Sequence, residues 1–255
     1  MKKTILRAVA LLLIITSLTL FIYPFVSKQV IQGKNNVIIQ KFDIISENVQ
    51  DGDSEEAEHE GKVNNEGYPI NEDGEVISDY PVVFERDLEK LYQDSFAYNE
   101  RLKERQDLHV DFSDAALNLS DYGIYNGIYG YISTPAVELN LPIYLGASDS
   151  NMAWGATHLT NTSLPLGGES TNIVIAGHTG YFGRVVFDGI PSLNEGDTVS
   201  ITTYFDTLDY RVISKKEISA TETNDIYIVK GKDLLTLITC ARMGKSRFEV
   251  ICERE

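Results

Sequence analysis

Three residues of types that catalyse acyl transfer stand at the ends of apolar, strand-like segments. Cys240 ends the run Thr236–Cys240, His178 ends the run Asn172–His178, and Arg247 opens the run Arg247–Ile251. A thiol is a good nucleophile as thiolate, and a nearby His or Arg lowers its pKa. A histidine can protonate a leaving amine, and an arginine can stabilise an oxyanion. The pattern predicts Cys240 as nucleophile, His178 as general acid–base and Arg247 as electrostatic clamp.

Each of these residues also has an ordinary structural interpretation. A cysteine after an apolar strand is commonly a small buried hydrophobe, and we expect this of the second cysteine, Cys252. Arg247 could form a surface ion pair with Glu249 or Glu253. One cysteine and one histidine without a close second pair do not make a zinc site. We therefore expect neither a metal nor another cofactor.

The segments that would position these residues are predicted to be β-strands. From Gly127 onward, short apolar or alternating runs are separated by Gly, Pro and Asn turn signals. Seven or eight strands in about 130 residues indicate a mostly β domain, either a closed barrel or a sandwich. The predicted strands are Gly127–Ser133, Leu141–Leu145, Asn172–Ala176, Thr198–Tyr204, Asp209–Lys216, Leu234–Thr239 and Arg247–Cys252, with short helical turns at Asp149–Trp154 and Val185–Ile190.

A helix and a long loop are predicted before the strands. Apolar residues recur at three- and four-residue steps across Pro81–Gln106, which predicts an amphipathic helix that starts at the proline. Asp107–Tyr122 is polar and shows no strong periodicity. A loop of that length inside a compact domain is often functional.

The N-terminal segment predicts a membrane anchor. Lys2, Lys3 and Arg7 precede Ala8–Val26, which carries no charge and matches the ~20 residues that a spanning helix needs. A cleaved signal peptide is the alternative, but its apolar core would be shorter. The positive-inside rule then places the N-terminus in the cytoplasm and everything after Ser27 outside the cell.

The net charge of −16 is concentrated in one segment. Asp51–Tyr80 contains eleven acidic residues and one lysine, so it carries about −10 of that charge. Such a composition cannot bury enough apolar surface to fold, and it predicts a solvated tether. Apolar residues at helical spacing in Ser27–Val49 predict that the N-terminal helix continues toward this tether. No basic face indicates nucleic-acid binding, and two cysteines exclude a disulfide-dense scaffold.

Several short motifs, taken with the three residues above, resemble the sortases, membrane-anchored cysteine transpeptidases of Gram-positive bacteria. The similarity covers roughly Gly127–Val250 and points most to the class C, pilus-building members. It is carried by Ala97-Tyr98-Asn99, Leu141–Gly146, His158-Leu159, Thr162–Gly168, Ala176-Gly177-His178, Phe187, Glu195-Gly196-Asp197, Lys230–Leu234, Thr236–Cys240 and Arg247.

The resemblance implies an eight-stranded sortase-type β-barrel preceded by N-terminal helices and a membrane anchor. It implies cleavage of an LPXTG-like sorting signal between Thr and Gly, through a thioester on Cys240. A pilin lysine would take the acyl group in pilus polymerisation. Two alternatives are a housekeeping-type enzyme that uses a cell-wall peptidoglycan amine, and a non-catalytic tethered β-barrel that binds partners.

Class C sortases usually carry an Asp-Pro-aromatic lid over the active site. Here Asp111 and Phe112 occupy the corresponding loop without the proline, so they are candidate lid or substrate-binding residues, as is Thr239 beside the nucleophile. An ordinary loop aromatic is the alternative for Phe112. The chain also departs from the class in Ala241–Gly244 after the cysteine and in Thr179 after the histidine.

The sequence thus predicts four regions. They are a cytoplasmic tail with a transmembrane signal anchor (1–27), a juxtamembrane segment with an acidic linker (28–80), a helix with the predicted lid loop (81–122) and the β-barrel catalytic domain (123–255).

Overall fold

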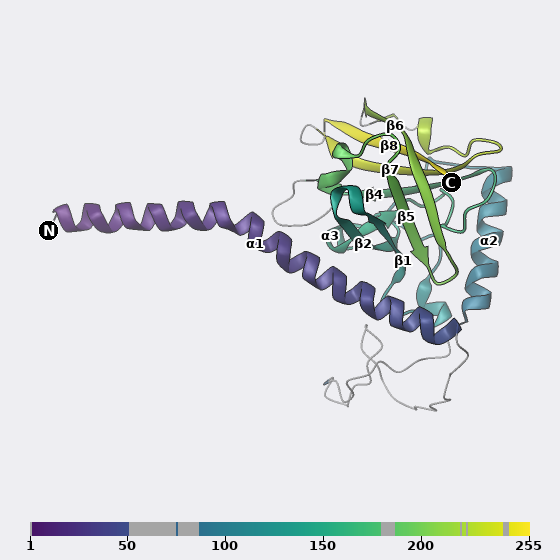
Figure 1. Ribbon diagram of the computed structural model, residues 1–255, viewed down its shortest axis with the longest axis horizontal. Helices are drawn as coiled ribbons and strands as arrows, with labels where there is room; N and C mark the ends of the chain where they lie inside the picture. The colour runs from purple at the N-terminus through teal and green to yellow at the C-terminus, as the bar shows by residue number, and fades with distance from the viewer. Residues whose placement is uncertain are drawn as a thin grey trace.

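The computed structural model describes residues 2–50, 75, 87–179, 187–219, 221–222, 224–241 and 245–255, and its centre is a closed β-barrel (Figure 1). The barrel follows the order β1-β2-β3-β4-β7-β8-β6-β5, and β5 pairs with β1 to close it. The strands are β1 (Ile128–Thr134), β2 (Leu139–Leu145), β3 (Ala156–His158), β4 (Thr171–Gly177), β5 (Thr198–Thr203), β6 (Thr207–Ser219), β7 (Asp233–Ala241) and β8 (Ser246–Arg254).

Two of the strand pairings are parallel, and one of them matters for the site. β2 pairs with β3 and β4 pairs with β7 in parallel, whereas the other neighbours are antiparallel. Parallel neighbours run in the same direction, so the C-terminal ends of β4 and β7 lie at the same rim of the barrel.

The barrel is filled by side chains that alternate along its strands, as expected when one face of a strand is buried. Ile173 and Ile175 of β4, Leu235 and Leu237 of β7, and Cys252 of β8 all belong to one fully buried interior cluster. The predicted eight-stranded barrel and the apolar environment of Cys252 are therefore confirmed. The sequence prediction missed β3, whose three residues are too few to show an alternating pattern.

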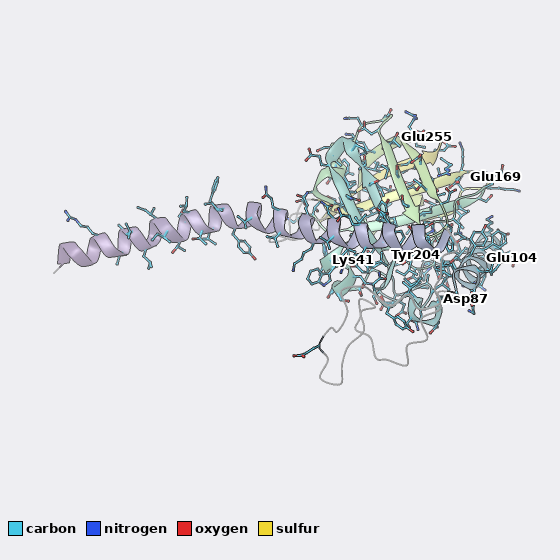
Figure 2. The ribbon with its side chains drawn as sticks, turned by 60° about the horizontal axis from the view of Figure 1, so that its bottom comes forward. Lys41, Asp87, Glu104, Glu169, Tyr204 and Glu255 are labelled. Atoms are coloured by element: carbon cyan, nitrogen blue, oxygen red, sulfur yellow. The ribbon has the colours of Figure 1, made fainter. Side chains whose placement is uncertain are left out.

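One long helix, α1 (Lys2–Gln50), leads into the domain, and its C-terminal half docks on the barrel (Figures 1 and 2). Ile39 and Phe42 are buried there, and the Phe42 ring lies 5.7 Å from that of Tyr131 and 4.4 Å from that of Tyr204. The predicted continuation of the helix through Ser27–Val49 is confirmed. Within the parts of the chain that the structure describes, no helix combines the length and apolarity needed to cross a membrane.

The predicted helix before the barrel is α2 (Leu88–Glu104), which starts later than Pro81. Asp87 caps it, because its carboxylate accepts a hydrogen bond from the Lys90 N–H at 2.8 Å. Pro81 and most of the predicted acidic linker lie outside the described residues.

Short helical turns occupy the barrel connections. Asp149–Trp154 is helical as predicted (α3), and the predicted turn at Val185–Ile190 begins at Phe187 within the described residues (η3, Phe187–Ser192). The remaining turns are η1 (Leu119–Tyr122), η2 (Pro135–Val137) and η4 (Asn224–Ile226).

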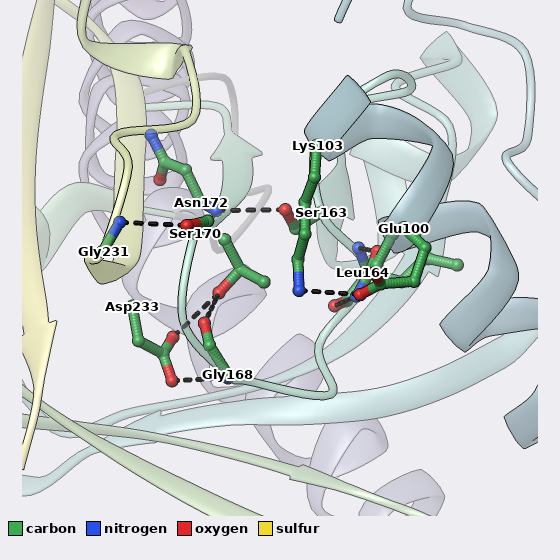
Figure 3. A network of polar contacts seen from close by, with 11 residues as sticks. Glu100, Lys103, Ser163, Leu164, Gly168, Ser170, Asn172, Gly231 and Asp233 are labelled. Carbon is green, nitrogen blue, oxygen red and sulfur yellow. Dashed lines mark hydrogen bonds and ion pairs between the residues drawn. The ribbon is translucent and has the colours of Figure 1, made fainter. Parts of the chain in front are cut away.

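Polar side chains fix the barrel rim where β4 and β7 begin (Figure 3). The Asp233 carboxylate accepts hydrogen bonds from the Gly168 N–H at 2.7 Å and the Thr171 hydroxyl at 3.1 Å. The Asn172 N–H donates to Ser163 Oγ at 3.0 Å, and the Gly231 N–H donates to Ser170 Oγ at 2.9 Å. These bonds hold the connection before β4 in place and so set the relative register of β4 and β7.

Asn99 joins α2 to the same connection and gives a first prediction. Its side-chain amide donates to the Leu164 carbonyl at 3.0 Å and accepts from the Leu164 N–H at 2.8 Å, all in a buried setting. Asn99→Ala would leave two buried backbone groups unsatisfied, so we expect a loss of about 2–4 kcal/mol in the free energy of unfolding. Urea denaturation measures it, with exposed Asn118→Ala as a control expected to change stability by less than about 0.5 kcal/mol.

Candidate active site

The three predicted catalytic residues come together at one rim of the barrel through strand register. Gly177, the last residue of β4, is in register with Thr239 of β7, so His178 and Cys240 follow side by side. Cys240 is in turn the register partner of Arg247 on β8. The histidine and the cysteine are 62 positions apart in sequence, but the parallel pairing of β4 with β7 brings them next to each other.

Alternation along the strands assigns these three positions to the outer face of the barrel. Ile175 and Leu237 point into the interior cluster, whereas Ala176 and Ile238 belong to a separate cluster outside it. Counting by twos from Ala176 and Ile238 gives positions 178 and 240, and position 247 pairs directly with 240. The strand pairing therefore brings the positions of a histidine, a cysteine and an arginine together at this rim.

The His178 backbone is held by a close contact at the end of β4. The Phe187 N–H donates to the His178 carbonyl at 2.8 Å, and the fully buried Phe187 ring lies against Gly177. A Cβ at position 177 would stand 2.9 Å from Phe187 Cγ, closer than real Cβ contacts allow. Glycine before the histidine is thus required by the approach of Phe187, which explains the Gly177-His178 pair in physical terms.

Thr239 is placed inside the strand pairing. Its side chain is 1% exposed, and its hydroxyl donates to the Gly177 carbonyl at 2.8 Å, with the Thr179 hydroxyl 3.4 Å away. The candidate role of Thr239 in substrate binding or in a lid stays a prediction. The structure shows that its hydroxyl links the strand of the cysteine to the strand of the histidine.

Phe112 lies over the outer face of the strands that lead to the site. Its half-buried ring packs on the outer cluster, which includes Ala176, Ile238 and Ile226. Its carbonyl accepts a hydrogen bond from the Ala147 N–H at 2.6 Å, so the loop is tied to the segment after β2. Gly146 permits this approach, because a Cβ there would stand 2.6 Å from the Ser113 carbonyl.

Asp111 is exposed and turns back on its own loop. Its carboxylate accepts a hydrogen bond from the Ser113 N–H at 2.9 Å, and this bond lowers the pKa of Asp111. The side chain therefore stabilises the turn that carries Phe112. The predicted proximity of Asp111 to Arg247 stays a prediction.

Sequence reasoning missed a charged cluster beside the site. Glu249, considered above only as a surface partner of Arg247, is fully buried on the outer face of β8, with Oε2 3.7 Å from Lys216 Nζ. Lys216 also forms an ion pair with Asp225, whereas Glu253 pairs with Lys232. An acidic residue within the alternating pattern of β8 reads as solvent-exposed, so the sequence carried no sign of its burial. Among the described residues, no group of three or more His, Cys, Asp or Glu is arranged to hold a metal ion.

Comparison with known proteins agrees with this geometry. A family model described as the sortase domain matches residues 132–255. Sortase C2 of Group B Streptococcus pilus island 1 superposes with a TM-score of 0.59 at 32% identity, covering 66% of this chain and 97% of that one. The chain belongs to the sortase family. Sortase C-1 from Actinomyces oris is similarly related, at 30% identity and a TM-score of 0.58, covering 66% of this chain and 98% of that one.

The curated relatives of this sortase carry a different class name. Sortase A of Bacillus anthracis is 30% identical over 113 residues, which are 44% of this chain and 52% of that protein. The chain spans about half the length of the curated relatives it matches. Several similar solved structures, by contrast, are named as sortases C of a pilus island or as pilus-related.

The position of Phe112 gives a second prediction. If the ring shields Cys240, Phe112→Ala will speed modification of Cys240 by a small thiol reagent several-fold. Mass spectrometry of the modified peptides measures the rate. Cys252 serves as an internal reference, because burial raises the pKa of its thiol to about 12 and keeps it unreactive in the folded chain.

A matched control removes an aromatic ring elsewhere. Phe96→Ala on α2 deletes a ring that is 48% exposed, and it should leave the Cys240 rate unchanged. Equal rates of Cys240 modification in wild type and Phe112→Ala would show that Phe112 does not act as a lid.

Proposed function

We propose that this sortase is a membrane-anchored cysteine transpeptidase that cleaves an LPXTG-like sorting signal and transfers the acyl group to a pilin lysine. The observation that carries the proposal is the register of β4, β7 and β8, which brings His178, Cys240 and Arg247 to one rim of a sortase barrel. These are the residue types that thiol-based acyl transfer needs.

In the first half-reaction, the Cys240 thiolate would attack the carbonyl carbon of the threonine in the sorting signal. The tetrahedral oxyanion would be stabilised by the Arg247 guanidinium. Collapse of the intermediate breaks the Thr–Gly C–N bond, and His178 donates a proton to the departing glycine amine. The products are a thioester on Cys240 and the released C-terminal peptide.

In the second half-reaction, an acceptor amine would attack the thioester. His178, now neutral, takes a proton from the amine, and the Cys240 thiolate leaves as the new amide bond forms. Arg247 again faces the oxyanion. Acceptors must reach the outer face of the barrel, where the apolar cluster and the Phe112 loop border the approach.

Two acceptors follow from the same chemistry. Similar solved structures are named as sortases of a pilus island or as pilus-related, which supports a pilin lysine. The curated relatives are named Sortase A, which supports the alternative of a housekeeping-type sortase with a peptidoglycan amine as acceptor. The sequence resemblance to class C favours the pilin.

The membrane anchor is part of the proposal and rests on the N-terminal sequence. Along Val9–Val26, large apolar side chains of α1 such as Leu12, Leu20 and Phe21 are exposed, on the part of the helix that stands away from the barrel (Figure 1). Removing residues 2–26 should move the chain from the membrane to the soluble fraction of fractionated cells. A full-length chain found in the soluble fraction would contradict the anchor.

Replacing the nucleophile tests the chemistry. Cys240→Ala should lower cleavage of an LPXTG-type peptide by more than about 10³-fold, since no thioester can form. Cys252→Ala is the matched control, because that cysteine is buried in the barrel interior, and it should retain cleavage. Cleavage that persists in Cys240→Ala would overturn the proposed function.

The acceptor is tested in the cell that expresses the chain. Loss of high-molecular-weight pilin ladders in the Cys240→Ala strain, with other surface proteins still attached to the wall, indicates the pilin lysine. Loss of many wall-attached surface proteins with intact ladders indicates the peptidoglycan amine instead.

A further inference from the structure

A lysine and two carboxyl groups from three separate elements meet beside the candidate active site. They are Lys216 of β6, Asp225 of η4 and Glu249 of β8. Lys216 and Asp225 are partly exposed, whereas the Glu249 side chain has no solvent exposure. A fully buried glutamate is rare unless it is paired or protonated.

Strand register places this cluster one step from the catalytic positions. Glu249 is paired with Lys216 on β6 and with Ile238 on β7. On β7 and β8, the next pair of residues that faces outward is Cys240 with Arg247. Two residues of a strand span about 6.5–7 Å, so any change at Glu249 occurs close to the reacting groups.

The oxygen atoms of Glu249 are short of hydrogen-bond donors. While Glu249 is ionised, neither oxygen accepts a hydrogen bond from a donor among the described residues, and Lys216 Nζ stands 3.7 Å from Oε2 while it pairs closely with Asp225. Lys216 pairs with the partly exposed Asp225, so an ionised Glu249 would be a buried charge without a close partner. A proton on Glu249 removes the surplus negative charge and supplies a donor to Asp225.

The pKa shifts of Glu249, Asp225 and Lys216 agree with a proton on Glu249. Burial, together with the hydrogen bond and negative charge of Asp225, raises the pKa of Glu249 to about 7. Burial opposes ionisation of Asp225 as well, but hydrogen bonds with Lys216 and Glu249 lower its pKa on balance. The hydrogen bond and charge of Asp225 raise the pKa of Lys216. The two carboxyl groups therefore share one proton at pH values below about 7 and release it as the pH rises through that value.

Charged groups face Glu249 from β6, from η4 and from the segment before η4. β6 presents Lys216, η4 presents Asp225, and Glu222 before η4 adds a negative charge. The neighbouring outward position on β8 is Arg247, and β7 presents Ile238, which does not titrate.

The element that this cluster holds forms a wall of the outer face. Ile226 of η4 belongs to the apolar cluster that also contains Ile238 and receives Phe112. Hydrogen bonds from Asn172 at 2.8 Å and Thr236 at 3.2 Å to the Asp225 carbonyl hold the η4 backbone. The charged cluster adds a second attachment, through the Asp225 side chain, on the β6–β8 side.

We propose that Lys216, Asp225 and Glu249 form an acid–base latch, which holds η4 on the outer face while its two carboxyl groups share a proton and loosens when both are ionised. Glu249 is then a positioning residue for the apolar wall beside Cys240. The consequence for acyl transfer rests on the proposed function, whereas the latch itself does not.

The direction of the pH effect follows from the raised pKa of Glu249. A carboxyl group with a higher pKa in the seated state stabilises that state fully below its ordinary pKa of 4.5, and the stabilisation is lost as pH rises through about 7. Between pH 6 and pH 8 the equilibrium constant for seating η4 should fall about tenfold. Replacing Glu249 with glutamine fixes the neutral form, so this fall should disappear.

Amide hydrogen exchange on the full-length chain tests the latch without any substrate. The readout is the protection factor, corrected for intrinsic exchange, in peptides that cover residues 224–229, which include the Ile228 N–H bound to Gln106 Oε1. We expect about tenfold less protection at pH 8 than at pH 6 in wild type and no change in Glu249→Gln. Glu253→Gln is the matched control, since Glu253 lies on β8 in a partly exposed pair with Lys232, and it should retain the wild-type drop.

A second arm uses turnover of an LPXTG-type peptide. KM should rise between pH 6 and pH 8 in wild type but not in Glu249→Gln, while the pH profile of kcat stays the same in both. A merely structural Glu249 would change stability at every pH and leave the KM profile unaltered. No turnover in any variant would refute the proposed function, and the exchange experiment would still decide the latch.

Two results overturn the latch. One is a protection drop in Glu249→Gln equal to that of wild type, and the other is a wild-type chain with no drop. Should Glu249→Gln not fold, as circular dichroism would reveal, Asp225→Asn removes the paired carboxylate at a partly exposed position. That variant must also lose the pH-dependent drop.

Discussion

The arrangement of the site depends on the position of β7 between β4 and β8. On one side β7 is parallel to β4 and matches Thr239 to Gly177, and on the other it is antiparallel to β8 and matches Cys240 to Arg247. A shift of one residue in either pairing would move a side chain to the opposite face of the barrel. The bonds of Asp233 to Gly168 and Thr171 at the far rim and the Thr239–Gly177 bond resist a shift of β7 against β4.

The same register explains why polar groups can be buried around the site. Thr239 uses its hydroxyl within the β4–β7 pairing, and Asn99 satisfies both backbone groups of Leu164. Glu249 differs from these two residues, because its carboxylate oxygen atoms have no donor among the described residues unless a proton is added. Buried polar groups are rarely left unsatisfied, so a proton on this carboxyl group, as the proposed latch requires, would stabilise the fold around it.

Much of the fold could be predicted from the sequence, because alternating apolar residues and turn signals marked most strands of the barrel. The apolar interior position of Cys252 also followed from its place in the last strand. β3 was missed because the three residues Ala156–His158 are too few to show an alternating pattern. The start of α2 at Leu88 was missed because it is set by the cap at Asp87. Periodicity locates the body of a helix better than its first residue.

The residue types of the candidate site could be predicted from the sequence. Motifs such as Ala176-Gly177-His178 indicated that these residues belong to one site. Its supporting contacts were not predictable, because they join residues far apart in sequence. Nothing near Glu249 in the chain indicates that Asp225 and Lys216 approach it, and nothing near Gly177 indicates the ring of Phe187. Such pairs arise from the closing of the barrel, which local patterns do not encode.

The docking of α1 on the barrel has a consequence for which substrates can be reached. From Val26 to Phe42 the chain is continuous helix, a distance of about 24 Å, and Phe42 is fixed against Tyr131 and Tyr204. A flexible tether would let the barrel sample many heights and orientations. Under the proposed function, a docked helix that continues from the proposed anchor would hold the catalytic rim at a set height above the bilayer. Selection among secreted proteins would then depend on geometry as well as on sequence, because a sorting signal would have to be presented at that height to be processed.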